Sequence, residues 1–146
     1  IRPGEIQVMS AGTGIEHSEF NPSPTDPVHL LQIWIHPRQR GLRPGYQQNV
    51  VQRNGAALTL LASSDGQDGS AVIHQDAALY LGELPAGRGL ASPLPAGRHA
   101  WVQMVHGRLR LNDVMLSQGD GASLSEAAVL DLQAETPAQF LLFHLG

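Results

Sequence analysis

The sequence predicts an all-β protein built as a sandwich or barrel of short strands. Sixteen glycines and ten prolines interrupt the chain, and short runs rich in Val, Ile, Leu and aromatic residues lie between them. No run shows helical periodicity for more than two turns. The predicted strands are Val28–Ile35, Ala57–Ala62, Ala71–His74, Trp101–His106 and Phe140–Leu145. For Ser125–Ala134 a short helix is the alternative, and we predict a strand with a bend.

Composition excludes several classes of protein. The 146 residues carry a net charge of −4, and all nine basic residues are scattered arginines, which does not suit a nucleic-acid-binding surface. No apolar run has the roughly 18–20 residues of a membrane helix, so a cytoplasmic location is the default expectation. There is no Cys, which excludes disulfides and thiolate metal sites. Any metal would be bound by His, carboxylate, carbonyl or water.

A repeated pattern indicates that the chain begins within a repeat unit. Residues 2–5, Arg-Pro-Gly-Glu, are echoed by the Gly-acid turn at 116–120, and strands of similar order follow each. The second copy is preceded by a predicted hairpin of Gly97–Val105 and Gly107–Leu116, whereas the first has nothing before it. We therefore expect one partial and one complete β-barrel. Chance similarity of two Gly-rich segments is the alternative.

The polar segment Pro37–Asn49 is typical of a linker between domains. It places the predicted domain boundary near Tyr46. Residues 1–46 would form the second half of a first domain plus the linker, and residues 47–146 a complete second domain.

The best candidate for metal chemistry is the sequence His17-Ser18-Glu19. Side chains alternate along an extended segment, so the imidazole and the carboxylate face the same way. Such a pair can chelate a metal or can simply form a hydrogen-bonded surface pair, which composition alone favours. Gly12 and Gly14 permit a sharp bend that would aim the pair inward. Two ligands are too few for a catalytic metal, which usually has three protein ligands.

The other histidines are weaker candidates. His74 is expected to bond a turn backbone, while His99 and Asp131 are the residues that a site in the second copy would use. Trp101 stands where a second His would be needed, so we predict no metal there. Trp34 and Trp101 are expected to be core aromatics.

The chain resembles the pirin family, and in particular the bacterial pirin-like proteins described as quercetin 2,3-dioxygenases. The likeness is strongest over residues 2–19, from Arg2 to Glu19, and continues through Leu31–Ile35, His74-Gln75-Asp76, Trp101–Gln103 and Leu141–Phe143. The resemblance implies a bicupin, two double-stranded β-helix barrels related to the jelly roll. The first is expected to be partial and the second complete.

The resemblance also implies a function. The family's first cupin binds one metal through a His-x-His pair and a later His-x-Glu pair, and His17 and Glu19 match the later pair. The metal would be a divalent transition metal, with Fe expected first and Ni, Co, Mn, Cu or Zn as alternatives. Glu19 would also be the base that takes a proton from a flavonol during its cleavage by O₂. The His-x-His pair is expected upstream of Ile1, so this chain alone would bind metal incompletely and be inactive. The alternatives are a pirin-type regulatory module that binds a protein partner and a metal-free structural barrel.

Overall fold

The computed structural model describes residues 1–126 and 128–146 of the chain. Over those residues the regular structure is almost entirely β. The strands are β1 (Glu5–Ser10), β2 (Gly45–Val50), β3 (Leu58–Ser63), β4 (Ala71–Val72), β5 (Ala77–Leu84), β6 (Gly89–Pro93), β7 (His99–His106), β8 (Arg108–Leu111), β9 (Val114–Ser117), β10 (Gly121–Ser125), β11 (Val129–Ala134) and β12 (Ala138–Leu145), with one 3₁₀ turn, η1 (Gln67–Gly69). The described residues include no helix long and apolar enough to span a bilayer. The prediction of an all-β fold is confirmed.

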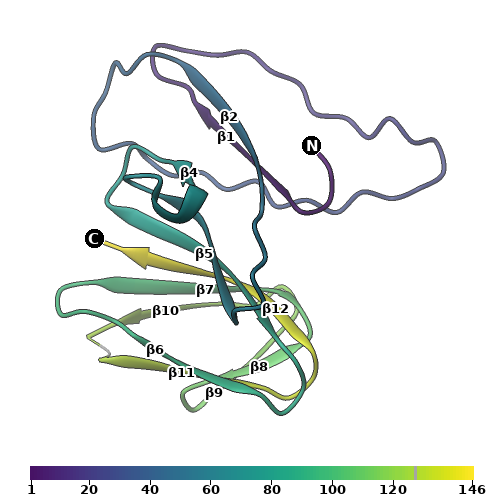
Figure 1. Ribbon diagram of the computed structural model, residues 1–146, viewed down its shortest axis with the longest axis vertical. Helices are drawn as coiled ribbons and strands as arrows, with labels where there is room; N and C mark the ends of the chain where they lie inside the picture. The colour runs from purple at the N-terminus through teal and green to yellow at the C-terminus, as the bar shows by residue number, and fades with distance from the viewer. Residues whose placement is uncertain (127) are drawn as a thin grey trace.

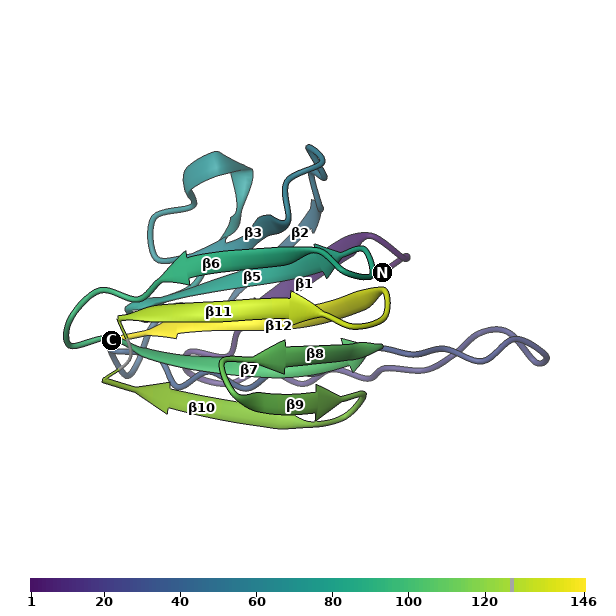
Figure 2. The same cartoon turned by 90° about the horizontal axis from the view of Figure 1, so that it is seen from below.

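Two sheets face each other in the C-terminal part of the chain (Figures 1 and 2). One has the strand order β10-β7-β12-β5-β3-β4, and the other has the order β6-β11-β8-β9. Alternate residues of β12 point into the space between them, so Phe140 and Leu142 are fully buried there. Val102, Met104, Leu109, Leu130 and Leu132 from both sheets complete this core. Burial of each large side chain stabilises the fold by about 1.5–3 kcal/mol.

The two N-terminal strands form a separate ribbon against the outer face of the six-stranded sheet. β1 and β2 pair antiparallel, with Glu5 opposite Val50 and Ser10 opposite Gly45. Ile6 and Val8 of β1 pack against a second apolar cluster that includes Leu61, Leu79 and Leu141. Figure 1 shows this ribbon beside β4, apart from the paired C-terminal sheets. One face of the β1–β2 ribbon therefore packs against the six-stranded sheet, and the opposite face points away from it.

A long connection, residues 11–44, joins β1 to β2 and runs away from the sheets as an extended loop (Figures 1 and 2). Its two ends come together at Gly12, where an added Cβ would collide with the Leu42 carbonyl oxygen. Near the C-terminal end of this loop, Arg38 N donates to His74 O at 2.7 Å. This bond uses the backbone carbonyl of His74, so the predicted role of its side chain stays a prediction. The Arg38–His74 bond ties the loop to the body of the protein.

The predicted strand Val28–Ile35 is wrong. No described strand lies alongside this segment, so its backbone has no ladder partner and it is not a strand despite its apolar sequence. The prediction of Trp34 and Trp101 as core residues is wrong as well, because Trp34 is 87% exposed and Trp101 is 37% exposed. We call Val28, Leu30, Leu31, Ile33 and Trp34 the apolar strip, since all five are exposed.

The predicted hairpin around His106-Gly107 is also wrong. β7 pairs with β10 and β12, whereas β8 pairs with β9 and β11 in the other sheet. Gly107 makes this crossing with φ +81, where an added Cβ would collide with the Pro137 carbonyl oxygen. A glycine is needed because the chain turns a tight corner between sheets.

In the four-stranded sheet, β8 and β9 are joined by the two-residue turn Asn112-Asp113, with Asn112 in the left-handed region at φ 49. The stretch Ser125–Ala134, predicted as a strand with a bend, contains the last residue of β10 and all of β11. Residue 127 of this stretch lies outside the described residues.

Candidate metal and substrate site

His17 and Glu19 lie on the extended segment that follows a Gly-rich bend. Gly12 and Gly14 have φ of +54 and +132, a conformation that favours glycine at both positions. The bend turns the chain back over the β1–β2 ribbon. His17 Nδ1 then lies 3.8 Å from Glu19 Oε1, and both side chains are 38% exposed. The expectation that alternate side chains would converge is thus met by the geometry.

The pair borders a hollow of about 520 Å³. Its lining comes from three places: Gln7 and Met9 of β1, residues 15–19 of the loop, and Pro44, Gly45 and Tyr46 at the start of β2. The hollow lies on the face of the ribbon that points away from the six-stranded sheet, opposite the face on which Ile6 and Val8 pack. An aromatic ring, one side-chain amide, an imidazole and two carboxylates therefore surround one space.

A chain of hydrogen bonds runs across the same face. Gln7 Nε2 donates to the Tyr46 hydroxyl at 2.6 Å, and this hydroxyl donates to Gln48 Oε1 at 2.6 Å. Gln48 Nε2 then donates to Glu5 Oε2 at 2.8 Å. The bonds fix the position of the Tyr46 ring at the edge of the hollow. The sequence identified Tyr46 only as a domain boundary. Its place in the site follows from the pairing of β1 with β2, which no local sequence motif indicates.

The donor set suits a divalent transition metal but is incomplete. Imidazole nitrogen and carboxylate oxygen are donors that Fe, Ni, Co, Mn, Cu and Zn all accept. Among residues 1–126 and 128–146, however, no group of three or more His, Cys, Asp or Glu side chains converges. His17 and Glu19 supply two donors of the right type, fewer than the three protein ligands that a catalytic metal usually has.

The other predicted site residues are not brought together. His99 Nδ1 lies 2.8 Å from Ser125 Oγ, on the six-stranded sheet. Asp131 is on the four-stranded sheet, where it accepts a bond from Gln133 Nε2 at 3.1 Å. His144 lies inside the C-terminal domain beside Tyr80, with ring centroids 5.3 Å apart. Burial, with a smaller effect of the Arg98 charge, lowers the pKa of His144.

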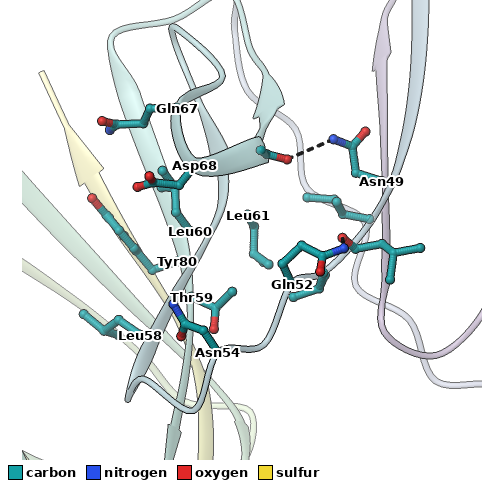
Figure 3. Close-up of a pocket in the computed structure, with 14 residues that line it drawn as sticks. Asn49, Gln52, Asn54, Leu58, Thr59, Leu60, Leu61, Gln67, Asp68 and Tyr80 are labelled. Atoms are coloured by element: carbon teal, nitrogen blue, oxygen red, sulfur yellow. Dashed lines mark hydrogen bonds between the residues drawn. The ribbon is translucent and has the colours of Figure 1, made fainter.

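A second cavity, of about 460 Å³, lies between the chain leading out of β2 and the strand β3 with the turn η1 (Figure 3). Amide side chains of Asn49, Gln52, Asn54 and Gln67 border it, and Asp68 is its one lining carboxylate. Asn49 Nδ2 spans it at one side by donating to Gly69 O at 3.2 Å. With no histidine in its lining, it lacks the donors that make the first hollow a metal-site candidate.

Two facing β-sheets around an apolar core are typical of the jelly-roll class of folds, which includes the cupins. Comparisons with known proteins agree. The family described as "Quercetinase C-terminal cupin domain" matches residues 60–145, and the family described as "Pirin" matches residues 1–35. The chain belongs to the pirin family of cupin proteins, so both the predicted family and the predicted cupin fold are confirmed.

Individual relatives are longer than this chain. The quercetin 2,3-dioxygenase of Escherichia coli K12 is 41% identical over 145 residues, which are 97% of this chain and 61% of that protein. The crystal structure of YhhW from E. coli matches with a TM-score of 0.93 and 38% identity, over 100% of this chain and 62% of that one. The crystal structure of the bacterial pirin YhhW with nickel(II) gives a TM-score of 0.89 and 40% identity, over 97% and 61% of the two chains. The chain thus spans about three-fifths of the length of these relatives.

Proposed function

We propose that this chain is the larger part of a pirin-type dioxygenase that cleaves a flavonol such as quercetin with O₂. The observation that carries the proposal is the approach of His17 Nδ1 to within 3.8 Å of Glu19 Oε1 beside a hollow large enough for an aromatic ligand. Relatives named quercetin 2,3-dioxygenase support the substrate class. A relative solved with nickel(II) supports a divalent metal.

The proposal includes a division of the chain and a source for the missing ligands. Residues 1–46 would belong to a first cupin, and residues 47–146 to a second. The proposed boundary falls within β2, so the ribbon would be shared by both units. The remaining ligands, a His-x-His pair, would come from a segment that is not among these 146 residues. The unpaired apolar strip supports this arrangement, because it offers such a segment an apolar surface and free backbone groups.

Each residue of the pair has its own role in the proposal. His17 would hold the metal through its imidazole, and Glu19 would both hold it and accept the proton of the flavonol hydroxyl. A bound divalent cation would lower the pKa of that hydroxyl, so that a carboxylate is a strong enough base. We propose iron as the metal, with nickel as the first alternative. The Glu19 side chain is 38% exposed, which leaves room for a ligand to reach it.

The test uses the longer polypeptide that contains this chain, loaded separately with iron and with nickel. Flavonol loss is followed by absorbance, and O₂ consumption by an electrode. We expect turnover with at least one metal, and its loss in His17→Ala and Glu19→Gln. His29→Ala is the matched control, since His29 is an exposed histidine of the same loop outside the hollow. A protein that holds metal but consumes neither flavonol nor O₂ contradicts the proposal.

A further inference from the structure

Tyr46 is a partly exposed aromatic residue at the edge of the hollow, 57% exposed and held by two glutamines. We propose that Tyr46 binds the aromatic substrate of this site, with its ring as a stacking surface and its hydroxyl oxygen as a hydrogen-bond acceptor. This inference rests on the proposed function and deepens it by assigning a substrate-binding residue.

The strand register places Tyr46 in the hollow. In the β1–β2 pair Met9 lies opposite Tyr46, and Gln7 lies opposite Gln48. Because side chains alternate along a strand, these four share one face of the ribbon. The other face carries Ile6 and Val8 and is packed against the C-terminal domain. Tyr46 therefore faces the same side as the hollow that His17 and Glu19 border.

The hydrogen bonds of the Tyr46 hydroxyl leave one acceptor position for a ligand. A phenol hydroxyl has one donor and two acceptor positions. Its hydrogen goes to Gln48 Oε1, and one lone pair accepts from Gln7 Nε2. One lone pair is left, so Tyr46 can accept a bond from a ligand hydroxyl but cannot donate one without breaking the chain. A polyphenol carries the required donors, and its flat rings suit stacking on the exposed tyrosine.

A purely structural role makes a different prediction. The Gln7–Tyr46–Gln48 bonds also join β1 to β2, so a structural residue would change the stability of the protein without changing its ligand affinity. Two variants separate the contributions. Tyr46→Phe keeps the ring and removes the hydroxyl, while Tyr46→Leu removes the ring as well. Tyr80→Phe is the matched control, because Tyr80 lies in the C-terminal domain and does not line this hollow.

The experiment measures quercetin binding to the metal-loaded longer polypeptide without oxygen, by fluorescence titration, together with metal content and the unfolding midpoint. With Tyr46→Phe we expect binding about 3- to 10-fold weaker, the effect of one hydrogen bond. With Tyr46→Leu we expect at least roughly tenfold weaker binding because stacking is lost too. Metal content should be unchanged in both, and Tyr80→Phe should bind as the wild type does.

A ligand series tests the hydroxyl contact directly. Flavonols that each lack one hydroxyl group of quercetin are titrated into the wild type and Tyr46→Phe. One analogue should bind equally to both proteins, because the partner of Tyr46 is then missing. The inference is overturned if wild type binds quercetin and both variants bind it within twofold. If the metal-loaded wild type binds no quercetin, the proposed function fails, and this inference fails with it.

Discussion

The side-chain amide of Gln47 pairs with the backbone of Val72 as if it were a strand residue. Gln47 Nε2 donates to Val72 O at 3.0 Å, and Val72 N donates to Gln47 Oε1 at 2.9 Å. The two residues are 25 positions apart and belong to β2 and β4. These two hydrogen bonds fix the N-terminal ribbon to the edge of the six-stranded sheet. They thereby set the position of the hollow relative to the C-terminal domain.

Gln47→Ala is expected to lower the free energy of unfolding by about 1–3 kcal/mol, because a part-buried donor and acceptor of Val72 both lose their partner. Urea denaturation followed by circular dichroism measures the change. Gln52→Ala is the control, since within the described part of the chain its side chain makes one marginal contact, to Val50 O at 3.5 Å. Equal stability of the two variants would show that the amide pair contributes nothing.

His17→Ala should remove most of the metal from the longer polypeptide, because the imidazole donor it deletes cannot be replaced by water without a large loss of affinity. Glu19→Gln keeps a carbonyl oxygen at the same place, so it should retain more metal than His17→Ala, but its turnover should still be lost because an amide cannot act as the base. Metal content by mass spectrometry and flavonol turnover are measured on the same samples. If the two variants keep wild-type metal content, these side chains are the hydrogen-bonded surface pair that composition favoured.

Parts of the fold could be predicted from local sequence, and parts could not. β3, β7 and β12 coincide closely with apolar runs bounded by turn residues, because each is buried on at least one face. The strip around Trp34 has the same local pattern and forms no strand, since pairing depends on a partner that no window of sequence contains. The corner at Gly107 has the same explanation: a hairpin and a crossing between sheets look alike until the register is known.

The site shows the same limit. The approach of His17 to Glu19 follows from alternation along an extended segment, so it could be predicted from three residues. The contribution of Tyr46 depends on the pairing of β1 with β2 across the long loop 11–44. Nothing near Tyr46 in the sequence indicates which strand it faces.

Gly82→Ala is expected to destabilise the C-terminal domain by about 1–3 kcal/mol. Gly82 lies opposite Phe140 in the β5–β12 pair, and an added Cβ would collide with the fully buried Phe140 ring. Gly45→Ala is the control, because nothing lies near an added Cβ there. In the Gly82→Ala/Phe140→Leu double variant the collision is gone, so its loss of stability should be smaller than the sum of the single losses.

His144 should make the stability of the protein depend on pH. The dependence falls in the pH range between the lowered pKa of His144 in the folded protein and its ordinary pKa near 6.5. Burial is the main cause of the lowered pKa, and the Arg98 charge adds to it. In that window the unfolded chain binds more protons than the folded one, so the free energy of unfolding rises with pH. The contribution is complete above pH 6.5 and is lost as the pH falls.

His144→Leu should remove this part of the pH dependence, as measured by urea denaturation from pH 5 to pH 8. His106→Leu, at an exposed position of β7, is the control and should keep the wild-type dependence. A wild-type protein whose stability does not change between pH 5 and pH 7 would contradict the desolvation of His144.

The fluorescence of Trp34 tests whether another segment covers the apolar strip. In a Trp101→Phe background Trp34 is the only tryptophan, and at 87% exposure it should emit at long wavelength and be quenched freely by acrylamide in the 146-residue chain. In the longer polypeptide, a segment pairing with the strip would bury the indole, shift its emission to shorter wavelength and reduce quenching severalfold. Trp34→Phe in place of Trp101→Phe is the control, because Trp101 lies on β7 of the C-terminal domain and should respond little. If Trp34 remains fully accessible in the longer polypeptide, the strip is not part of a completed barrel, and its exposed apolar surface favours the pirin-type role of binding a protein partner instead.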